Sequence, residues 1–448
     1  MSFDPLPVSK GTEDHLKQAH SGSHRLKWLA GAVAVIGMAG LTACGGTTQD
    51  AGTQPVQSSS ATTGVDPKQS PVELVDYPSS STWGKLSSLD RRILLQVADI
   101  HRVFSRPGGA AGIWDEGFRP DRTPMVLGPR QGTETPSHAY VIGHPDPGKL
   151  GDATRVDLPA ELGLPDVYRI TKGSGLGAFV SQPFWSTELG GVKTWIMAYG
   201  KGEYEDLTAA AKRSYATAEY WVTASIMVHE LFHYYQAKFR LQGPQIPAAS
   251  QFPADRPAWS AMALLEHQVL RQGATTAEQA RQILRTFLAV RRARDAMAAP
   301  DVRANEQHQL LLEGTARYVE VLYVRAAGRT PPGDRIQLDT PLDLYREVAP
   351  PMPGRAYPDG KRLSELLDLL HSGHSWRAKL YTDDVGLEKL VREKVTPPAP
   401  AEGDRLISRA KQDHDYESLL RLVREADLPE RKRETMEALK SMNLKVGG

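Results

Sequence analysis

The pattern of hydrophobic and polar positions divides the chain into a first half of short strands and a second half of helices. Apolar side chains recur with a helical period through residues 85–105, and Pro107-Gly108-Gly109 ends that helix. Between residues 113 and 200 the pattern changes to short apolar runs separated by glycine and proline, which is typical of strands. The expected strands are 124–128, 139–142, 167–171, 177–180 and 192–199.

After residue 200 the apolar positions follow a helical period. The expected helices are 206–240 (as one helix or two), 257–272, 276–297, 304–327 and 361–371, with three short helices after residue 404. Strands that precede helices, rather than alternate with them, predict an α+β fold. We therefore expect an N-terminal helix and an antiparallel sheet, followed by a mainly helical half.

The first 44 residues have the pattern of a secretory signal. Residues 28–43 carry no charge and follow Arg25 and Lys27, but these 16 residues fall short of the ~20 that span a bilayer. The segment ends in Leu41-Thr42-Ala43-Cys44, which resembles a bacterial lipobox, and Cys44 is the only cysteine of the chain. The resemblance implies that Cys44 is lipidated and anchors the protein in the cell membrane on the extracytoplasmic side. The alternative is a buried structural cysteine after a signal anchor.

Beyond this signal, the composition suggests three further segments. Residues 45–70 are mostly Gly, Thr, Ser, Gln and Ala, a composition that predicts a flexible tether because it cannot bury enough apolar surface to fold. We expect a folded domain over residues 71–400 and a helical C-terminal extension over residues 401–448.

The overall composition excludes several classes of function. Of the 448 residues, 54 are basic and 53 are acidic, and this balance offers no electrostatic reason to expect a nucleic-acid partner. A single cysteine excludes an intrachain disulfide and a zinc site built from several cysteines. A metal ion in this chain would therefore be held by other ligands.

The sequence His229-Glu230-Leu231-Phe232-His233 carries the clearest chemical signal. Two histidines four residues apart lie on one face of a helix, one turn from each other, which suits two ligands of a tetrahedral zinc ion. Glu230 would then lie next to a zinc-bound water. The alternative is a buried pair of hydrogen-bonded histidines. A metzincin pattern is excluded because Gln236 and Phe239 occupy the positions that it requires for glycine and histidine.

The identity of the third zinc ligand distinguishes the remaining kinds of zinc site that contain this motif. A glutamate from a later helix would make the site a gluzincin site, and Glu266 and Glu313 are both candidates. Glu306, Glu313 and Glu320 recur every seven residues, so neighbours of the ligand could orient it. We expect Glu306 to belong to a solvated helix stripe, and we expect the same of Arg291, Arg292 and Arg294.

The segment around Glu313 resembles one in a known family of enzymes. Glu313-Gly314-x-Ala316-x-Tyr318-x-Glu320 is similar to a segment of gluzincin metallopeptidases, in which the first glutamate is the third zinc ligand. The resemblance implies a zincin-like fold and zinc bound by His229, His233 and Glu313. We then expect Glu320 to be a neighbour of the ligands, and Glu266 to be either a neighbour of the ligands or a structural residue. Weaker similarities extend it over roughly residues 90–380, including residues 355–360, which resemble a Tyr-x-x-Gly segment that opens a later helix.

The chain departs from zinc aminopeptidases in two ways. The 80 positions from His233 to Glu313 imply an insertion that includes residues 257–297, and the Gly-Ala-Met-Glu-Asn segment that anchors a free amine is missing. We therefore expect an endopeptidase rather than an exopeptidase, acting on a peptide or protein substrate.

The resemblance also implies roles for individual residues. Glu230 would act as general base on a zinc-bound water, and Tyr357 would stabilise the oxyanion. A strand within residues 190–199 would hold an extended peptide. The alternatives are a non-catalytic binding lipoprotein with a peptidase-like fold, and a zinc hydrolase of a non-peptide amide.

Overall fold

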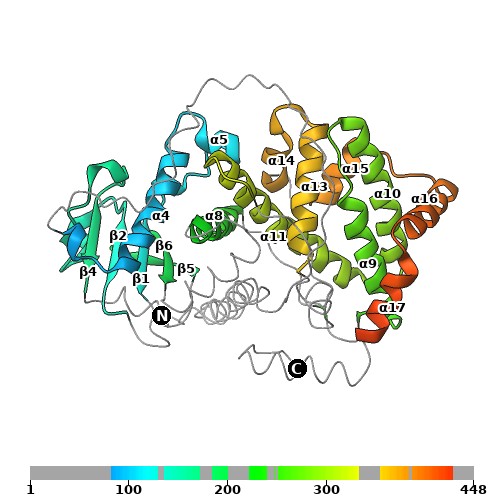
Figure 1. The fold of residues 1–448 in the computed structure, drawn as a ribbon, viewed down its shortest axis with the longest axis horizontal. Helices are drawn as coiled ribbons and strands as arrows, with labels where there is room; N and C mark the ends of the chain where they lie inside the picture. The colour runs from blue at the N-terminus through cyan, green and yellow to red at the C-terminus, as the bar shows by residue number, and fades with distance from the viewer. Residues whose placement is uncertain are drawn as a thin grey trace, which may run out of the picture.

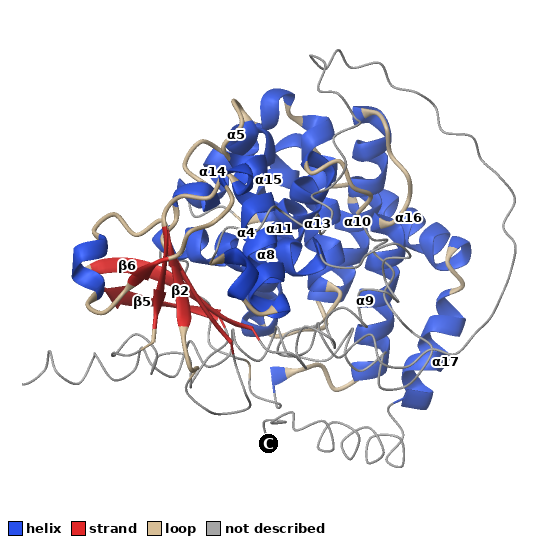
Figure 2. Cartoon of the chain, turned by 60° about the vertical axis from the view of Figure 1, so that its left-hand side comes forward, coloured by secondary structure: helices blue, strands red, loops and turns tan. Residues whose placement is uncertain are grey.

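The sheet and most of the helices lie at opposite ends of the molecule in the computed structural model (Figure 1). The structure describes residues 82–129, 136–171, 184–199, 221–239, 247, 251–331, 354–382 and 386–426. Figure 2 shows the strands gathered at one side and helices forming the rest. The broad prediction of an α+β fold with a mainly helical second half is confirmed. The expected signal, lipidation residue and tether lie outside the described residues.

The sheet has six strands in the order β3-β4-β2-β1-β6-β5. The strands are β1 (Met125–Pro129), β2 (Ala139–Ile142), β3 (Thr154–Arg155), β4 (Val167–Ile170), β5 (Phe184–Leu189) and β6 (Val192–Tyr199). Four of the expected strands are therefore confirmed, and 177–180 lies outside the described residues. The strands β3 and β5 were not expected. β5 and β6 form a hairpin whose turn, Gly190-Gly191, needs glycine because both residues have positive φ, 56° and 80°.

The expectation of an antiparallel sheet is wrong at its centre. Strand β1 pairs in parallel with β6, in a register that places Met125 opposite Trp195, whereas the other four pairs are antiparallel. An alternating or apolar run indicates which faces of a strand are buried, but it carries no information on the direction of its neighbour. Both β1 and most of β6 are buried on both faces, as is usual for central strands.

The expected helices of the second half are found to within about five residues where they are described, and residues 206–220 and 427–448 lie outside the described residues. The described helices of this half are α8 (Trp221–Gln236), α9 (Arg256–Leu270), α10 (Ala277–Asp295), α11 (Pro300–Ala326), α13 (Ala356–Leu370), α14 (Trp376–Thr382), α15 (Leu387–Lys394), α16 (Pro400–Asp413) and α17 (Tyr416–Ala426). The expected insertion is occupied by α9 and α10. Helices α14 and α15 were not expected. In the first half, α4 (Ser88–Phe104) has Ser87 as its N-cap, and α5 (Gly109–Ile113) follows.

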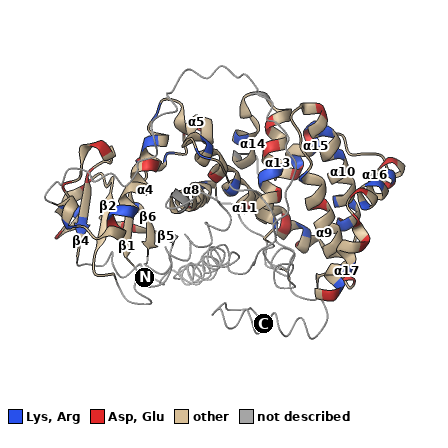
Figure 3. Ribbon diagram, viewed as in Figure 1, with Lys and Arg blue, Asp and Glu red and all other residues tan. Residues whose placement is uncertain are grey.

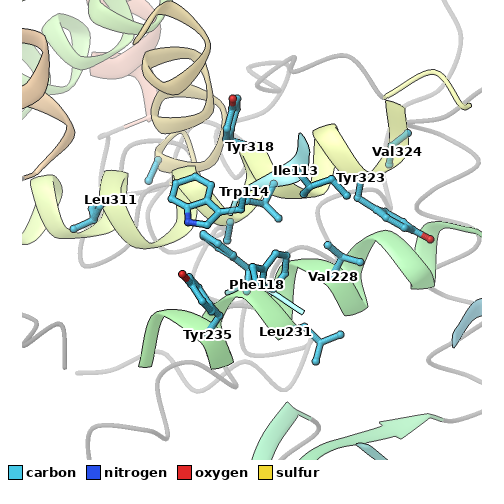
Figure 4. Packing of buried hydrophobic residues seen from close by; sticks show 14 of the residues in the cluster. Ile113, Trp114, Phe118, Val228, Leu231, Tyr235, Leu311, Tyr318, Tyr323 and Val324 are labelled. Carbon is cyan, nitrogen blue, oxygen red and sulfur yellow. The ribbon is translucent and has the colours of Figure 1, made fainter. Parts of the chain in front are cut away.

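Helix α8 lies between the sheet and the other helices (Figure 1). One side of it packs into an aromatic cluster, part of which Figure 4 shows around Trp114, Phe118 and Tyr235. The Phe232 ring contacts the rings of Trp114 and Phe118 at centroid distances of 4.8 and 5.1 Å, both edge to face. This packing fixes the rotation of α8 about its axis, so that its histidine face turns toward α11.

Charged residues of both signs are interspersed over the described helices, in keeping with the balanced composition (Figure 3). In the part of the chain that the structure describes, no helix is long and apolar enough to cross a membrane.

Candidate metal centre

Three side chains from two helices converge at one point in the core. His229 and His233 come from successive turns of α8, and Glu313 comes from the middle of α11. The two Nε2 atoms lie 3.1 Å apart, and they lie 3.4 Å (His229) and 3.3 Å (His233) from Glu313 Oε2. In a tetrahedral zinc site with metal–ligand distances of about 2.0–2.1 Å, ligand atoms are about 3.3–3.4 Å from one another. The triangle therefore has the dimensions of three zinc ligands.

The hydrogen bonds around this triangle also favour a cation. Glu313 is 1% exposed, and its Oε1 atom is buried without a hydrogen-bond partner among the described residues. The other imidazole nitrogen of His229, Nδ1, lies 3.4 Å from Glu320 Oε2. Because an ionised carboxylate can only accept, Nδ1 carries a hydrogen, and Nε2, which faces Glu313, is the nitrogen at which a metal ion would replace a proton. Two imidazole nitrogens and the Glu313 carboxylate, gathered where the protein excludes water, suit the binding of a positive ion.

The pKa values of these groups reflect the same arrangement. Burial alone would lower the pKa of His229, but the carboxylates of Glu313 and Glu320 outweigh it and raise the pKa to about 10. Burial raises the pKa of Glu313, yet the neighbouring His233 and His229 hold it well below its usual range. The protein without metal therefore attracts a proton to the place where a metal ion would bind.

Glu320 is held beside His229 by two further contacts. Arg317 Nη1 donates a 2.6 Å hydrogen bond to Glu320 Oε1, and Ser225 donates one of 3.2 Å to the same oxygen. Burial would raise the pKa of Glu320, but Arg317 and His229 lower it to about 2, so the group stays ionised. Glu320 is thus placed, as expected, as a neighbour of the ligands that can orient one of them.

Glu230 follows His229 on α8 and is also buried. Burial raises its pKa, and the negative charges of Glu313 and Glu320 add to the rise, while His233 and His229 oppose it. A carboxylate with a raised pKa binds a proton more readily than an ordinary glutamate. This is the property that a general base near neutral pH requires.

Tyr357, near the start of α13, lies against the same group. Its ring stacks on His229 with a centroid distance of 5.8 Å and an angle of 24°. Burial raises the pKa of Tyr357 well above 10, and the charge of Glu313 adds to the rise. The hydroxyl therefore keeps its proton and can act as a hydrogen-bond donor.

A contact between two glycines brings Tyr357 to this position. A Cβ atom on Gly314 would lie 2.3 Å from Gly360 Cα, and one on Gly360 would lie 2.3 Å from the Leu310 carbonyl oxygen. Helices α11 and α13 can approach this closely only because both residues lack a side chain. The glycine that follows Glu313 and the glycine that ends the Tyr-x-x-Gly segment are therefore partners, which their separation in the sequence conceals.

Glu266 belongs to a different cluster, which joins α9, α10, α11 and α13. We call it the arginine cluster, and it consists of Glu266, Arg291, Arg294, Glu306, Arg355 and Asp359. Arg294 contacts Glu266 at 2.7 Å and Glu306 at 2.5 Å. Among the described residues, the ion-pair partners of Glu266 are all arginines of this cluster, so Glu266 connects helices and does not orient the three candidate ligands.

The expectation that Glu306, Arg291 and Arg294 are solvated is wrong. Glu306 is 5% exposed and the two arginines are 1% and 0% exposed. A helical stripe of charged residues faces water in most proteins, but the sequence pattern is the same when it faces a complementary stripe on another helix. Only Arg292, on the other side of α10, is exposed as expected.

The strand that could hold a peptide also differs from the expected one. β6 is paired on both sides, with β1 and with β5, so its backbone is not free. Among the described strands, β5 is the terminal one at this end of the sheet, and it contacts α8. Extension of the sheet by a peptide would therefore occur at β5.

Sequence reasoning missed one residue of the centre. Gln236 Oε1 lies 2.7 Å from Nδ1 of His233. Its position three residues after His233, on the same face of the helix, is a signal that could have indicated this contact.

Two cavities lie away from the three ligands. One of about 510 Å³ lies between the ends of α9 and α13, and one of about 220 Å³ is lined by residues on the opposite side of α8. Neither is lined by a residue of the triangle, so neither is assigned to this centre.

A scan of protein-family models and searches of curated proteins and of solved structures found no match to this chain.

Proposed function

We propose that the protein is a zinc-dependent peptidase of the cell envelope. The observation that carries the proposal is the triangle of His229, His233 and Glu313, whose sides of 3.1–3.4 Å suit a tetrahedral metal ion. The resemblance of the two sequence segments to gluzincin metallopeptidases points to the same three ligands. The described residues contain no other group of this kind.

Two histidines and a glutamate leave a fourth position of a tetrahedral ion open, as catalytic zinc sites do. When bound, zinc would supply the Lewis acidity that activates water and polarises a carbonyl group. The buried Oε1 of Glu313, which has no hydrogen-bond partner among the described residues, and Nε2 of His229, which faces Glu313, fit such an ion.

The residues around the ligands would handle protons and charge. Glu230, whose pKa is raised by burial, would take a proton from the attacking water and pass it to the leaving amine. The protonated hydroxyl of Tyr357 would donate a hydrogen bond to the oxygen that becomes negative. Glu320 would keep the His229 ring in place.

The decisive experiment changes Glu230 to glutamine, which keeps the size of the side chain but removes its basicity. We expect Glu230→Gln to bind one zinc ion, as the wild type does, and to cleave a diverse peptide library about 10³-fold more slowly. Glu278→Gln makes the same chemical change at an exposed position of α10 and is the control.

The outcomes separate the alternatives. Unreduced cleavage by Glu230→Gln would contradict the mechanism. A wild-type protein that binds zinc but cleaves no member of the library would favour a binding lipoprotein instead. Cleavage of non-peptide amides, without cleavage of peptides, would favour a zinc hydrolase of a non-peptide amide.

The proposed location rests on residues 41–44 alone. We expect metabolic labelling with a fatty acid to mark the wild type and not Cys44→Ala, and we expect the variant to leave the membrane fraction. Membrane attachment of an unlabelled wild type would contradict a lipid anchor.

A further inference from the structure

We propose that Gln236 is a positioning residue of the metal centre. Its amide oxygen holds His233 with Nε2 turned toward the metal, and its amide nitrogen joins α8 to the helix that carries Glu313. The proposal rests on the metal site of the proposed function, but not on the hydrolysis of peptides.

The orientation of the Gln236 amide is set by helix α11. Gln236 is 1% exposed, and its Nε2 atom lies 3.1 Å from the Leu312 carbonyl oxygen and 2.9 Å from Thr315 Oγ1. A peptide carbonyl can only accept a hydrogen bond, so the amide group that faces it must be the NH2 group. Thr315 donates its own hydroxyl hydrogen to the Leu311 carbonyl at 2.6 Å, and it therefore accepts from Gln236. A third contact, of 2.9 Å to the Tyr381 hydroxyl, completes the surroundings of this nitrogen.

This orientation decides which nitrogen of His233 carries hydrogen. With the NH2 group turned to α11, the amide oxygen is the atom that lies 2.7 Å from His233 Nδ1. An amide oxygen only accepts, so Nδ1 carries a hydrogen and Nε2 is the nitrogen left for a metal ion. Nε2 points into the triangle, 3.3 Å from Glu313 Oε2. Both histidines thus have Nδ1 engaged by an acceptor and Nε2 directed into the triangle, the arrangement in which imidazole binds a metal ion once Nε2 has lost its proton.

The same amide also ties the second ligand to the third. Leu312, whose carbonyl accepts from Gln236, directly precedes Glu313 on α11. One side chain therefore connects the ring of His233 to the peptide group beside Glu313. Because helices α8 and α11 lie side by side and supply all three ligands (Figure 1), this link maintains the distance between the ligands as well as the orientation of one of them.

The two histidines are supported in chemically different ways. His229 is backed by the charged carboxylate of Glu320, whereas His233 is backed by a neutral amide. A second carboxylate behind His233 would add negative charge to a centre that already contains Glu230, Glu313 and Glu320. A neutral acceptor orients the ring without this addition.

The test compares Gln236→Leu with Gln282→Leu, which makes the same change at an exposed position of α10. Zinc affinity is measured by competition with a chelator, and the ligand field is measured from the visible absorption of the Co²⁺-loaded protein. We expect Gln236→Leu to lower zinc affinity by about 10–100-fold and to change the Co²⁺ spectrum. Gln282→Leu should match the wild type in both. Wild-type affinity and spectrum in a folded Gln236→Leu would overturn the proposal.

Two further measurements keep the proposal testable if Gln236→Leu does not fold. Gln236→Glu retains an acceptor for His233 but loses the donor to Leu312, so we expect zinc affinity within tenfold of the wild type and lower stability of the metal-free protein. A loss of affinity of tenfold or more in this variant would overturn the proposal.

The second measurement uses the zinc-loaded wild type, in which long-range ¹H–¹⁵N spectra should show hydrogen on Nδ1 of His233. Hydrogen on Nε2 would overturn the assignment. A protein that binds zinc in this way but cleaves no peptide would remove the proposed function and leave the role of Gln236 intact.

Discussion

The metal centre and the arginine cluster are both buried and both built on helix α11, but they balance their charges differently. The arginine cluster has three carboxylates and three guanidinium groups, so its charges cancel within the protein. In the metal centre, Glu230, Glu313 and Glu320 lie near one described guanidinium, that of Arg317. With neutral histidines, two negative charges remain.

This difference indicates what each cluster is for. A buried group of ions that is complete in itself holds four helices in one arrangement. A buried group that lacks two positive charges when its histidines are neutral can take up protons or a cation from outside, and a divalent ion would supply both charges. Each of the following predictions therefore tests whether the two regions differ in this way.

The largest effect should come from breaking the complete cluster. Arg294→Met leaves Glu266 and Glu306 buried with too little positive charge, so we expect the free energy of unfolding to fall by about 3–5 kcal/mol in urea titrations. Arg281→Met, on the exposed side of the same helix, should change it by less than about 0.5 kcal/mol. Equal stabilities of the two variants would mean that the buried contacts of Arg294 contribute little.

A somewhat smaller effect should follow the removal of zinc. Because zinc would bind the folded protein and not the unfolded chain, zinc at 100 times its dissociation constant should raise the free energy of unfolding by about 2.7 kcal/mol, and chelation should reverse this. Thermal unfolding with and without chelator measures it. The same increment is expected in Arg294→Met, since the arginine cluster does not bind the ion. If zinc left the melting temperature unchanged, the contrast between the regions would fail.

The smallest effect concerns the point where α11 and α13 touch. In Gly360→Ala the new methyl group would meet the Leu310 carbonyl, so we expect a loss of about 1–3 kcal/mol. Zinc affinity should fall as well, because Glu313 and Tyr357 flank this contact. Gly112→Ala, where a methyl group meets nothing within 4 Å, should be neutral or stabilising. An unchanged free energy of unfolding and unchanged zinc affinity in Gly360→Ala would show that the close contact between α11 and α13 contributes to neither.

Prediction from the sequence succeeded where the cause is local. The helical periods located α9, α10 and α11 to within a few residues, and the apolar run at 192–199 gave the bounds of β6. It failed where the cause is a partner distant in the chain. The pattern could not reveal that β1 is parallel to β6, or that Arg291 and Arg294 face Glu266 instead of water.

By itself, the sequence determined that His229 and His233 share one face of a helix, because four residues make about one turn whatever surrounds them. Residue type and position left both Glu266 and Glu313 as possible partners, and a family resemblance favoured Glu313. Both are buried on helices of the second half, and the tertiary structure shows which of them lies beside the histidines. It placed three arginines around Glu266 and no described arginine against Glu313, whose Oε2 atom instead lies 3.4 and 3.3 Å from Nε2 of His229 and His233.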